Sequence, residues 1–552
     1  ALKDALAAQQ QQIQQLNQQL QQNQQAWQQA QSAASDAANK AAAAQAQASQ
    51  QQQTVGELKG DVADLKTNVN NNALTLQETQ KNVTTALESP MAIHFKGVTL
   101  TPGGYLDATF TRRSRALAED AATPFNSVPM PGASQNSLSE FFGSGRQSRI
   151  SLLTQGQLKD IKLAGYVEAD FNSAGVTSNN NSTNSYTLRL RQAFGQAALE
   201  HGWTFTGGQQ WSLVTETGHG MDNRSEAIPL TIDSAYNVGF SFARQYGLRI
   251  VKNLDNKVWF GFAVESSQAT LTSHGNAANF LLGSVGNGKS YSTLANYSFN
   301  PSPDLIAKVA FEPGFGHYEV FGLFSRFRDR IFPCVDNFAS AACGAAADPV
   351  AALATNVSRN GGGIGANARW TFDNKHIVFG VHGLGGSGIG RYGTGGLPDT
   401  SAYADGSLHL IRAFQGLSTL EWHGSKLDVY LNGGTEYAAR TADFDPFLSS
   451  GAGAAVGYGS PSFSNSGCHT ETVPGASPAG FAPGALGKCT ADTRSLIEGT
   501  AGFWYRLYNG PKGRFQYGVQ YSYVTRYAWS GTGGEPHGID NMIMSSFRYF
   551  LP

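Results

Sequence analysis

Charged residues and long apolar runs are both scarce in this 552-residue chain. Asp, Glu, Lys and Arg make up 14% of it, against about 25% in an average soluble domain. No run of about 20 apolar residues occurs, which excludes a membrane-spanning helix. The net charge of −1 gives no general attraction to nucleic acid. Glycine (64 residues) and aromatic residues (11%) are plentiful. This composition suits a protein that meets lipid, and short strands closed into a barrel are then the remaining way to cross a membrane.

Cysteine is scarce too, and the four cysteines form two close pairs in Gly/Ala/Pro-rich stretches. This spacing predicts two disulfides, Cys334–Cys343 and Cys468–Cys489, and an oxidising compartment. Metal binding is the alternative, but only His469 adjoins a cysteine and no Cys-x-x-Cys occurs. The histidines are scattered, without a His-x-x-x-His pair or a Ser/His/Asp grouping. We therefore expect no metal, no cofactor and no enzymatic site.

Residues 1–89 repeat in heptads. Counted in steps of three and four from Leu6, apolar or alanine residues recur on one seam over about twelve uninterrupted heptads. A disordered Gln/Ala-rich linker is the alternative, but such a tract would not keep Leu, Ile and Val in phase at both ends. The pattern predicts a long left-handed coiled coil that ends at Pro90, which cannot continue a helix.

The oligomeric state of this coiled coil follows from its polar seam residues. Asn23, Gln51 and Asn72 occupy d positions, where a polar side chain costs stability and fixes the register. Val69 followed by Asn72 resembles the seam of trimeric adhesin stalks. We therefore expect a homotrimer, although β-branched residues at a with Leu at d also suit a dimer.

Residues 90–552 change to a periodicity of two, in which apolar and polar side chains alternate along short segments. An even number of strands is what a single-chain bacterial barrel requires, and we expect an all-β, transmembrane antiparallel β-barrel of about sixteen strands. The predicted strands lie near 94–113, 147–156, 161–173, 185–199, 202–213, 238–253, 256–268, 303–312, 317–332, 359–373, 375–388, 406–422, 426–441, 493–508, 513–528 and 540–550.

Short and long connections alternate between these strands. Outer-membrane barrels have short turns on the periplasmic side and long loops outside. This rule places both cysteine pairs outside the cell and the coiled coil in the periplasm. The expected location is the outer membrane of a diderm bacterium, with membrane lipid and lipopolysaccharide as neighbours.

One face of the predicted strands is charged and must turn inward, because a charge on the lipid face costs about 2–4 kcal/mol at the midplane. Arginine outnumbers acid there, which suits the passage of small anions; alternatively, these arginines only pair with acids and stiffen the wall. The third external loop, 215–237, is the candidate constriction through Glu216, Asp222, Arg224 and Glu226. The predicted inward set is Arg149, Lys162, Glu168, Asp170, Arg189, Arg191, Arg249, Arg326, Arg328, Arg330, Asp428, Glu436, Glu498, Arg506, Arg514 and Arg526.

Four motifs resemble the DcaP-like family of trimeric porins. They are Arg146-Gln147-Ser148-Arg149-Ile150, Gly165-Tyr166-Val167-Glu168-Ala169-Asp170-Phe171, Leu188-Arg189-Leu190-Arg191-Gln192-Ala193-Phe194-Gly195 and Gly208-Gln209-Gln210-Trp211-Ser212. The resemblance implies a trimeric barrel with a periplasmic coiled coil. It also implies passive uptake of small anions such as dicarboxylates, with Arg149, Arg189 and Arg191 as the residues in contact with them.

Two functions remain open at this point. A passive diffusion channel is favoured because about sixteen strands leave an aqueous lumen, whereas about eight fill their own interior. The alternative is a structural tether, in which the coiled coil spaces the outer membrane from the cell wall and meets the wall at its tip.

Overall fold

The structure is a computed structural model. It describes residues 2, 6–25, 27–29 and a few positions up to 59, and then residues 92–552 except 173–185, 268, 273–279, 282–300, 335–350, 447, 449–451 and 474–485. The chain divides into two compact units, Ala1–Glu88 and Ser89–Pro552. No helix within these described ranges is long and apolar enough to cross a membrane.

The first unit is helical over residues 6–25, which confirms a helix in this part of the predicted coiled coil. Leu6, Ile13, Leu16 and Leu20 are each more than half exposed on the single chain. An apolar stripe of this kind is stabilised by burial against another helix. The trimer itself stays a prediction. Of its register residues, Asn23 lies in this helix, whereas Gln51 and Asn72 fall outside the described residues.

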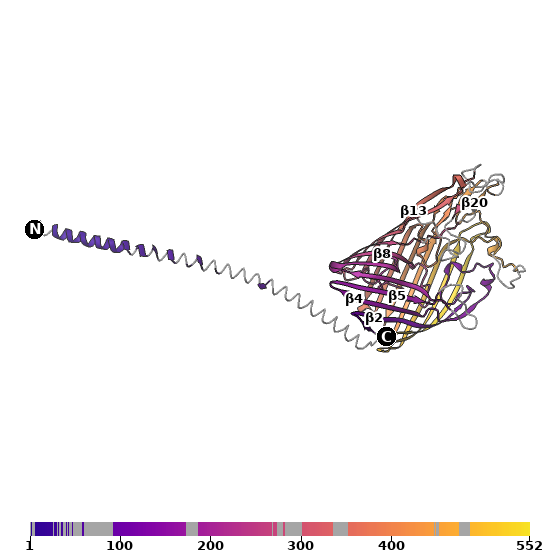
Figure 1. The fold of residues 1–552 in the computed structure, drawn as a ribbon, viewed down its shortest axis with the longest axis horizontal. Helices are drawn as coiled ribbons and strands as arrows, with labels where there is room; N and C mark the ends of the chain where they lie inside the picture. Colours follow the sequence, from indigo (N-terminus) through magenta and orange to yellow (C-terminus); the bar gives the residue numbers. More distant parts are fainter. Residues whose placement is uncertain are drawn as a thin grey trace. The chain divides into compact units, whose positions relative to one another are not determined.

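The second unit is a closed antiparallel barrel (Figure 1). It closes where β2 pairs with β23, with Tyr105 opposite Phe550. Sixteen described strands form the wall, as predicted. They are β2 (Val98–Arg113), β4 (Arg149–Leu158), β5 (Ile161–Asp170), β6 (Arg189–Ala198), β7 (Trp203–Trp211), β8 (Arg244–Leu254), β9 (Val258–Glu265), β11 (Asp304–Phe311), β12 (His317–Ile331), β13 (Thr355–Phe372), β14 (Ile377–Ser387), β17 (Arg412–His423), β18 (Leu427–Ala438), β21 (Thr493–Gly510), β22 (Gly513–Ala528) and β23 (His537–Phe550).

Short additional strands extend this sheet or pair within the connections. β1 (Ile93–Phe95) forms a hairpin with β2, while β3 (Glu140–Ser144) pairs with β2 and β10 (Phe280–Leu281) pairs with β12. Two small ribbons lie in the connections, β15 (Thr400–Ala402) with β16 (Leu408–Leu410) and β19 (Asp443–Asp445) with β20 (Ala454–Val456).

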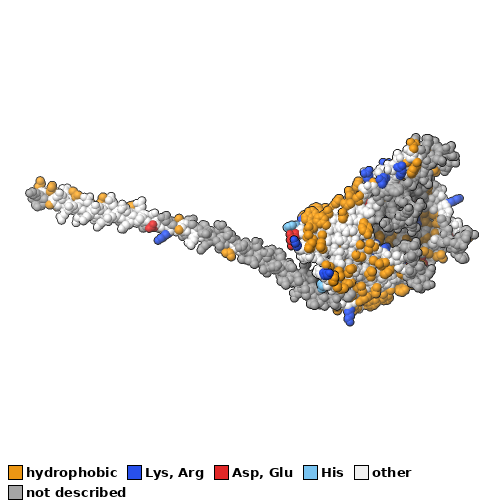
Figure 2. All heavy atoms as spheres, in the orientation of Figure 1, with side chains coloured by type: hydrophobic (Ala, Val, Ile, Leu, Met, Phe, Trp, Pro, Cys, Tyr) orange, Lys and Arg blue, Asp and Glu red, His pale blue; other side chains and the backbone are white. Residues whose placement is uncertain are grey.

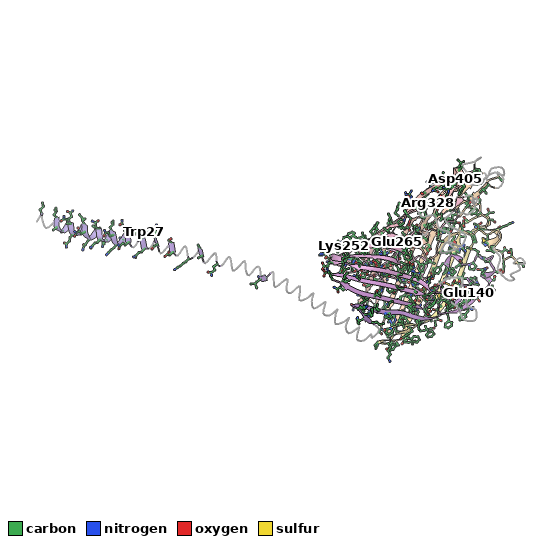
Figure 3. The ribbon with its side chains drawn as sticks, viewed as in Figure 1. Trp27, Glu140, Lys252, Glu265, Arg328 and Asp405 are labelled. Atoms are coloured by element: carbon green, nitrogen blue, oxygen red, sulfur yellow. A yellow bond between two sulfur atoms is a disulfide. The ribbon has the colours of Figure 1, made fainter. Side chains whose placement is uncertain are left out.

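Short and long connections alternate around the barrel, as the sequence predicted. The turn between β8 and β9 is typical of the short ones: Asp255 and Asn256 both have positive φ, a conformation that these two residue types tolerate well. Lys252 lies near this turn, at the end of the barrel opposite to Arg328 (Figure 3). The long connections gather at the Arg328 end, which is called the long-loop end below.

The barrel wall is apolar outside and polar inside. In β11, for example, Leu305, Val309 and Phe311 are exposed, whereas Asp304 and Lys308 are almost completely buried. The space-filling view shows hydrophobic side chains spread over the outer wall (Figure 2). A water-soluble protein has the reverse arrangement, so this outer surface is suited to contact with lipid.

Parts of the long connections pack inside the barrel. One hydrophobic cluster combines Val128, Val238 and Leu397, from three different connections, with Leu496 and Val524 of the wall. The lumen is therefore narrowed by folded chain.

The connection between β18 and β21 contains the disulfide Cys468–Cys489, which confirms that prediction. For the other predicted disulfide, Cys343 lies outside the described residues, so that pairing stays a prediction.

Candidate functional site in the barrel lumen

The connection 212–243 between β7 and β8, called the inner loop here, folds into the lumen. Backbone N–H groups of the loop donate to wall side chains on widely separated strands. Thr217 N donates to Glu319 of β12 (3.1 Å), and Ile232 N donates to Gln520 of β22 (2.6 Å). These contacts lie on different sides of the wall, so the inner loop crosses the barrel.

Two buried glutamates of the wall hold the far end of the inner loop. Val238 N donates to Glu498 Oε2 (2.8 Å), and Gly239 N donates to Glu436 Oε1 (3.0 Å). Glu436 also accepts from Gly395 N (3.1 Å), in the connection 388–411. Carboxylates that accept several N–H bonds are the stronger type of hydrogen-bond partner, and Glu436 ties two lumen loops to one point of the wall.

An arginine–carboxylate ladder crosses β4, β5 and β6 on the inner face. Arg191 Nε lies 2.6 Å from Glu168, and its Nη1 lies 2.8 Å from Asp170. Arg189 binds Asp170 with two nitrogens, at 2.9 and 2.8 Å. Arg149 reaches Glu168 at 3.5 Å. The ladder holds three arginines and two carboxylates, so one positive charge is left over.

Tyr236 of the inner loop ends this ladder. Its hydroxyl accepts a hydrogen bond from Arg191 Nη2 (3.2 Å). Burial would raise the pKa of this phenol, but the charges of Arg191, Arg149 and Arg244 outweigh burial and lower the pKa of Tyr236 to about 8. Tyr236 is therefore mostly neutral at pH 7 and half ionised near pH 8.

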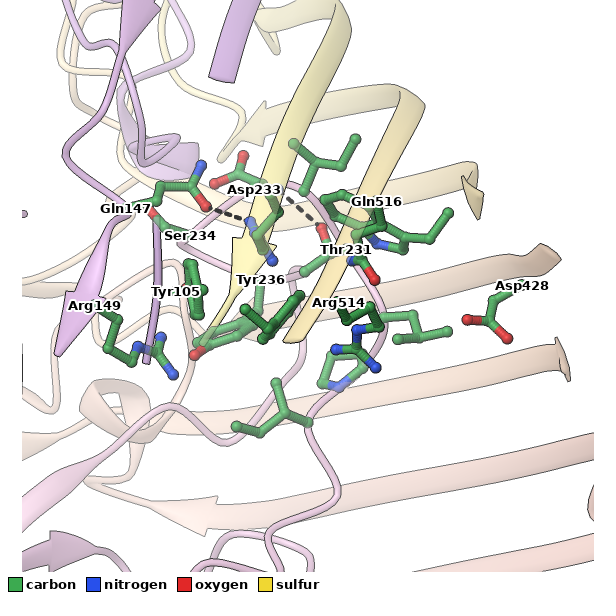
Figure 4. A pocket seen from close by; sticks show the side chains of 17 residues that line it. Tyr105, Gln147, Arg149, Thr231, Asp233, Ser234, Tyr236, Asp428, Arg514 and Gln516 are labelled. Atoms are coloured by element: carbon green, nitrogen blue, oxygen red, sulfur yellow. Dashed lines mark hydrogen bonds between the residues drawn. The ribbon is translucent and has the colours of Figure 1, made fainter. Parts of the chain in front are cut away.

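A cavity of about 260 Å³ lies between the inner loop and the wall (Figure 4). The inner-loop segment from Ile228 to Tyr236 forms one side. Arg149 and Arg514 project on either side of Tyr236 in this view (Figure 4). The charged lining residues are three arginines and two aspartates: Arg149, Arg514, Arg548, Asp233 and Asp428.

The aspartates of the lining are already engaged. Asp428 lies 3.1 Å from His423 and also binds Arg506. Asp233 accepts hydrogen bonds from Ala235 N (2.8 Å) and Thr123 N (3.2 Å), and burial raises its pKa. The charge of Asp428 is therefore balanced by Arg506, and the raised pKa of Asp233 favours its neutral form.

Two arginines of the lining keep unused hydrogen-bond donors. Arg514 stacks on Phe550 at 4.0 Å and forms no ion pair with any described residue, and its buried Nε has no hydrogen-bond partner there. The buried Nε of Arg149 likewise lacks a partner among the described residues. Arg548, by contrast, is held by Asp107 (2.9 Å) and Gln147 (3.0 Å). The cavity thus has the chemistry of an anion site.

The four predicted constriction residues lie near the start of the inner loop. Glu216 pairs with Arg369 of β13 at 2.8 Å. Arg224 stacks over Tyr166 at 4.8 Å, and its backbone N–H donates to Glu226 (3.2 Å). Asp222 is exposed. The structure does not bring these four to the cavity, which is lined by the later part of the same loop.

Most of the predicted inward set faces the lumen. Besides the five ladder residues and the Asp428, Glu436, Glu498 and Arg514 described above, these residues are Arg249, Arg506 and Arg526. All three are occupied by backbone carbonyls: Arg249 binds Trp211 O, Arg506 binds Gly424 O (2.8 Å), and Arg526 binds Ala491 O (3.0 Å). They hold the chain in place and leave the cavity to Arg149 and Arg514.

The prediction that Arg326, Arg328 and Arg330 line the lumen is wrong. In β12 the buried inward positions are Ser325, Phe327 and Asp329, so the three arginines alternate onto the outer face. They lie at the long-loop end of β12, away from the membrane midplane, where an outward charge costs only about 0–1 kcal/mol. The cost that excludes charges from the middle of the wall does not apply there.

Sequence reasoning missed Tyr105, Tyr236 and Arg548 as lining residues. Alternation along β23 could have placed Arg548 inside, since Ser546 and Met544 precede it on the same buried face. No sequence signal marks Tyr236, because only the path of the inner loop brings it beside Arg191.

A sixteen-stranded antiparallel barrel with a loop folded into a polar lumen is the fold on which porins are built. Among solved structures, the outer membrane channel DcaP of Acinetobacter baumannii is similar, with a TM-score of 0.54 and 14% identity over 83% of this chain and 99% of that chain. This agrees, at the level of the fold, with the resemblance carried by the four sequence motifs.

Two further solved structures give lower TM-scores. The anion-selective porin from Comamonas acidovorans has a TM-score of 0.42 and 11% identity, over 82% of this chain and 100% of that one. Salmonella typhi OmpF, in its complex with daunomycin, has a TM-score of 0.42 and 9% identity, over 84% and 100%. No protein-family model and no curated protein matches the sequence.

Proposed function

We propose that the protein is an outer-membrane channel for the passive diffusion of small anionic solutes. The observation that carries this proposal is the lumen cavity with Arg149 and Arg514 on either side of Tyr236 (Figure 4). Rings of arginine favour the passage of anions. Because Arg514 forms no ion pair with any described residue and stacks only on Phe550, an anion can bind it without first breaking an ion pair.

A solute with two carboxylates suits this site best. Arg149 and Arg514 come from different strands and can each contact one end of such a solute. Arginine presents a planar fork of donors that matches a carboxylate. Binding has to stay weak enough for release, and the partial engagement of Arg149 by Glu168 at 3.5 Å moderates it.

The membrane placement in this proposal is supported by the apolar outer wall and by the alternation of short and long connections. The short turns would face the periplasm and the long loops the outside. We further propose that residues 1–89 form a periplasmic coiled coil that joins three copies, because Leu6, Ile13 and Leu20 need partners for their exposed side chains.

Planar-bilayer recording of the purified full-length protein tests the channel. We expect current steps in groups of three and a reversal potential that indicates anion preference. A protein that inserts without conducting would contradict the channel, and cation preference would contradict the anion site alone.

The arginines of the cavity are tested by Arg149→Gln and Arg514→Gln. Removing one charge at about 4 Å from a solute in an aqueous lumen removes about 1 kcal/mol of attraction, so the anion preference should fall by up to about fivefold in each variant. Arg326→Gln is the matched control, because it removes the same charge from the outer wall. Equal effects of all three substitutions would show that the cavity is not the selective element.

A further inference from the structure

The outer face of β12 changes from apolar to basic at one point. Going toward the long-loop end, the outward residues are Val320 and Phe324, both exposed, and then Arg326, Arg328 and Arg330. The three arginines occupy successive outward positions of one strand and are called the arginine row here. Figure 2 shows basic side chains gathered beyond the hydrophobic surface at this edge, where Figure 3 labels Arg328.

The same change occurs on a nearby strand. In β17 the exposed Phe414 is followed, in the same direction along the barrel, by the exposed outward residue Arg412. The register connects the two places, because Phe324 pairs with Gly362, Gly362 pairs with Ser387, and Ser387 pairs with Arg412. Arg412 is thus three strands from Phe324, or about 14 Å across the wall, and belongs to the same basic surface.

This surface is not neutralised within the described structure. No carboxylate of a described residue pairs with Arg326, Arg328 or Arg412, and Arg330 donates instead to the amide of Asn356 (3.0 Å). The nearest acid along β12, Asp329, points to the inner face. Four positive charges therefore stand on the outer wall directly above an apolar belt.

We propose that the arginine row and Arg412 form a binding site for the phosphate groups of a phosphorylated glycolipid of the outer leaflet, that is, lipopolysaccharide. This inference rests on the outer-membrane location in the proposed function. Its ligand would have acyl chains against Phe324 and Phe414 and phosphates one step further out, at the level of the arginines. Guanidinium groups bind phosphate through paired hydrogen bonds, and basic clusters at a membrane interface bind lipid head groups.

Native mass spectrometry of the full-length protein in detergent, with added lipid A, tests this site. Lipid A that carries two phosphates should remain bound at higher collision energy than lipid A from which both have been removed. The triple variant Arg326→Gln/Arg328→Gln/Arg330→Gln should weaken binding of the phosphorylated form by about tenfold or more. A triple substitution by lysine keeps the charge and loses the paired geometry, so it should show an intermediate loss.

Arg359→Gln is the control, because Arg359 lies on the same hairpin opposite inward-facing Phe327. It should leave lipid A binding unchanged. Equal binding by wild type and triple glutamine variant, or equal binding of lipid A with and without phosphate, would overturn the inference. A change of oligomer mass in the triple variant would also overturn it, since the surface would then join two copies of the chain. Conductance in bilayers free of lipopolysaccharide is measured separately, so a failed channel proposal and a failed lipid site are distinguishable.

Discussion

Two adjacent arginines of the lumen have different tasks. Arg191 is buried and bound to Glu168, Asp170 and Tyr236. Removing one partner of such a buried network leaves an uncompensated charge and costs about 3–5 kcal/mol. Arg149 shares Glu168 at a longer distance and lines the cavity. Arg191 therefore stabilises the wall, and Arg149 is available to a solute.

In the proposed channel, ionisation of Tyr236 should make the anion preference sensitive to pH. Its pKa of about 8 means that a negative charge appears beside Arg191 and Arg149 as the pH rises from 7 to 9. The arginines stay protonated over this range. The reversal potential should therefore move toward lower anion preference across pH 8.

The variant Tyr236→Phe cannot ionise, and its reversal potential should stay constant over the same range. If wild type and variant change equally, the titrating group lies elsewhere.

A lowered tyrosine pKa also has a consequence for stability. The folded state favours the ionised form of Tyr236. Ionisation therefore adds to the free energy of unfolding; this addition is fully present above the unfolded pKa near 10 and is lost as the pH falls through about 8.

At the scale of elements, the inner loop is fastened by hydrogen bonds to several strands of the wall. Glu436 of β18 is an attachment point that the inner loop shares with the connection 388–411, since it accepts from Gly239, Thr394 and Gly395. In Glu436→Ala these donors lose their acceptor, and each unpaired buried donor costs about 1–3 kcal/mol. We expect both lumen loops to loosen, and single-channel recording should show a larger and noisier current.

Glu436→Gln is the matched control for this prediction. Its amide oxygen still accepts hydrogen bonds, so the current should stay closer to that of the wild type than in the alanine variant. Identical currents in wild type and Glu436→Ala would show that the inner loop does not depend on Glu436 for its position.

The strands were predictable because one face of each meets an apolar environment and the other a polar one. This alternation located all sixteen strands, although the predicted starts 238 and 406 lie six residues before the first residues of β8 and β17. The prediction of which side chains face inward is also correct where large apolar residues mark the outer face, as for Arg149 and Arg189. The same prediction is wrong for Arg326 and Arg328, because the assumption that charged side chains face inward holds only in the middle of the membrane.

The cavity was not predictable to the same extent. Arg149 and Arg514 follow from alternation, but Tyr236 and Asp233 lie in a connection that has no periodicity. Their positions depend on hydrogen bonds such as those of Ile232 to Gln520 and Thr123 to Asp233, which join residues more than 100 positions apart. A local sequence pattern contains no information about such contacts.

The whole molecule combines a barrel unit with an N-terminal helical unit whose apolar seam is exposed. If residues 1–89 join three copies, their deletion should lower the temperature at which the trimer dissociates, while each barrel still conducts. Gel mobility after stepwise heating measures the first effect, and bilayer recording measures the second.

The same deletion distinguishes the channel from the tether. Unchanged solute uptake together with a detached outer membrane would favour a tether. A truncated trimer that dissociates at the same temperature as the full-length trimer would contradict the role of the coiled coil in assembly.

The attachment points of the inner loop also set an order of events during biogenesis. Thr217 has its partner 102 positions later in the chain, and Ile232 has its partner 288 positions later. Contacts of such long range form slowly, because the intervening chain must first be ordered. The contact of Ile232 with Gln520 can therefore form only after β22 is in place, so the inner loop completes its attachments late in the assembly of the barrel.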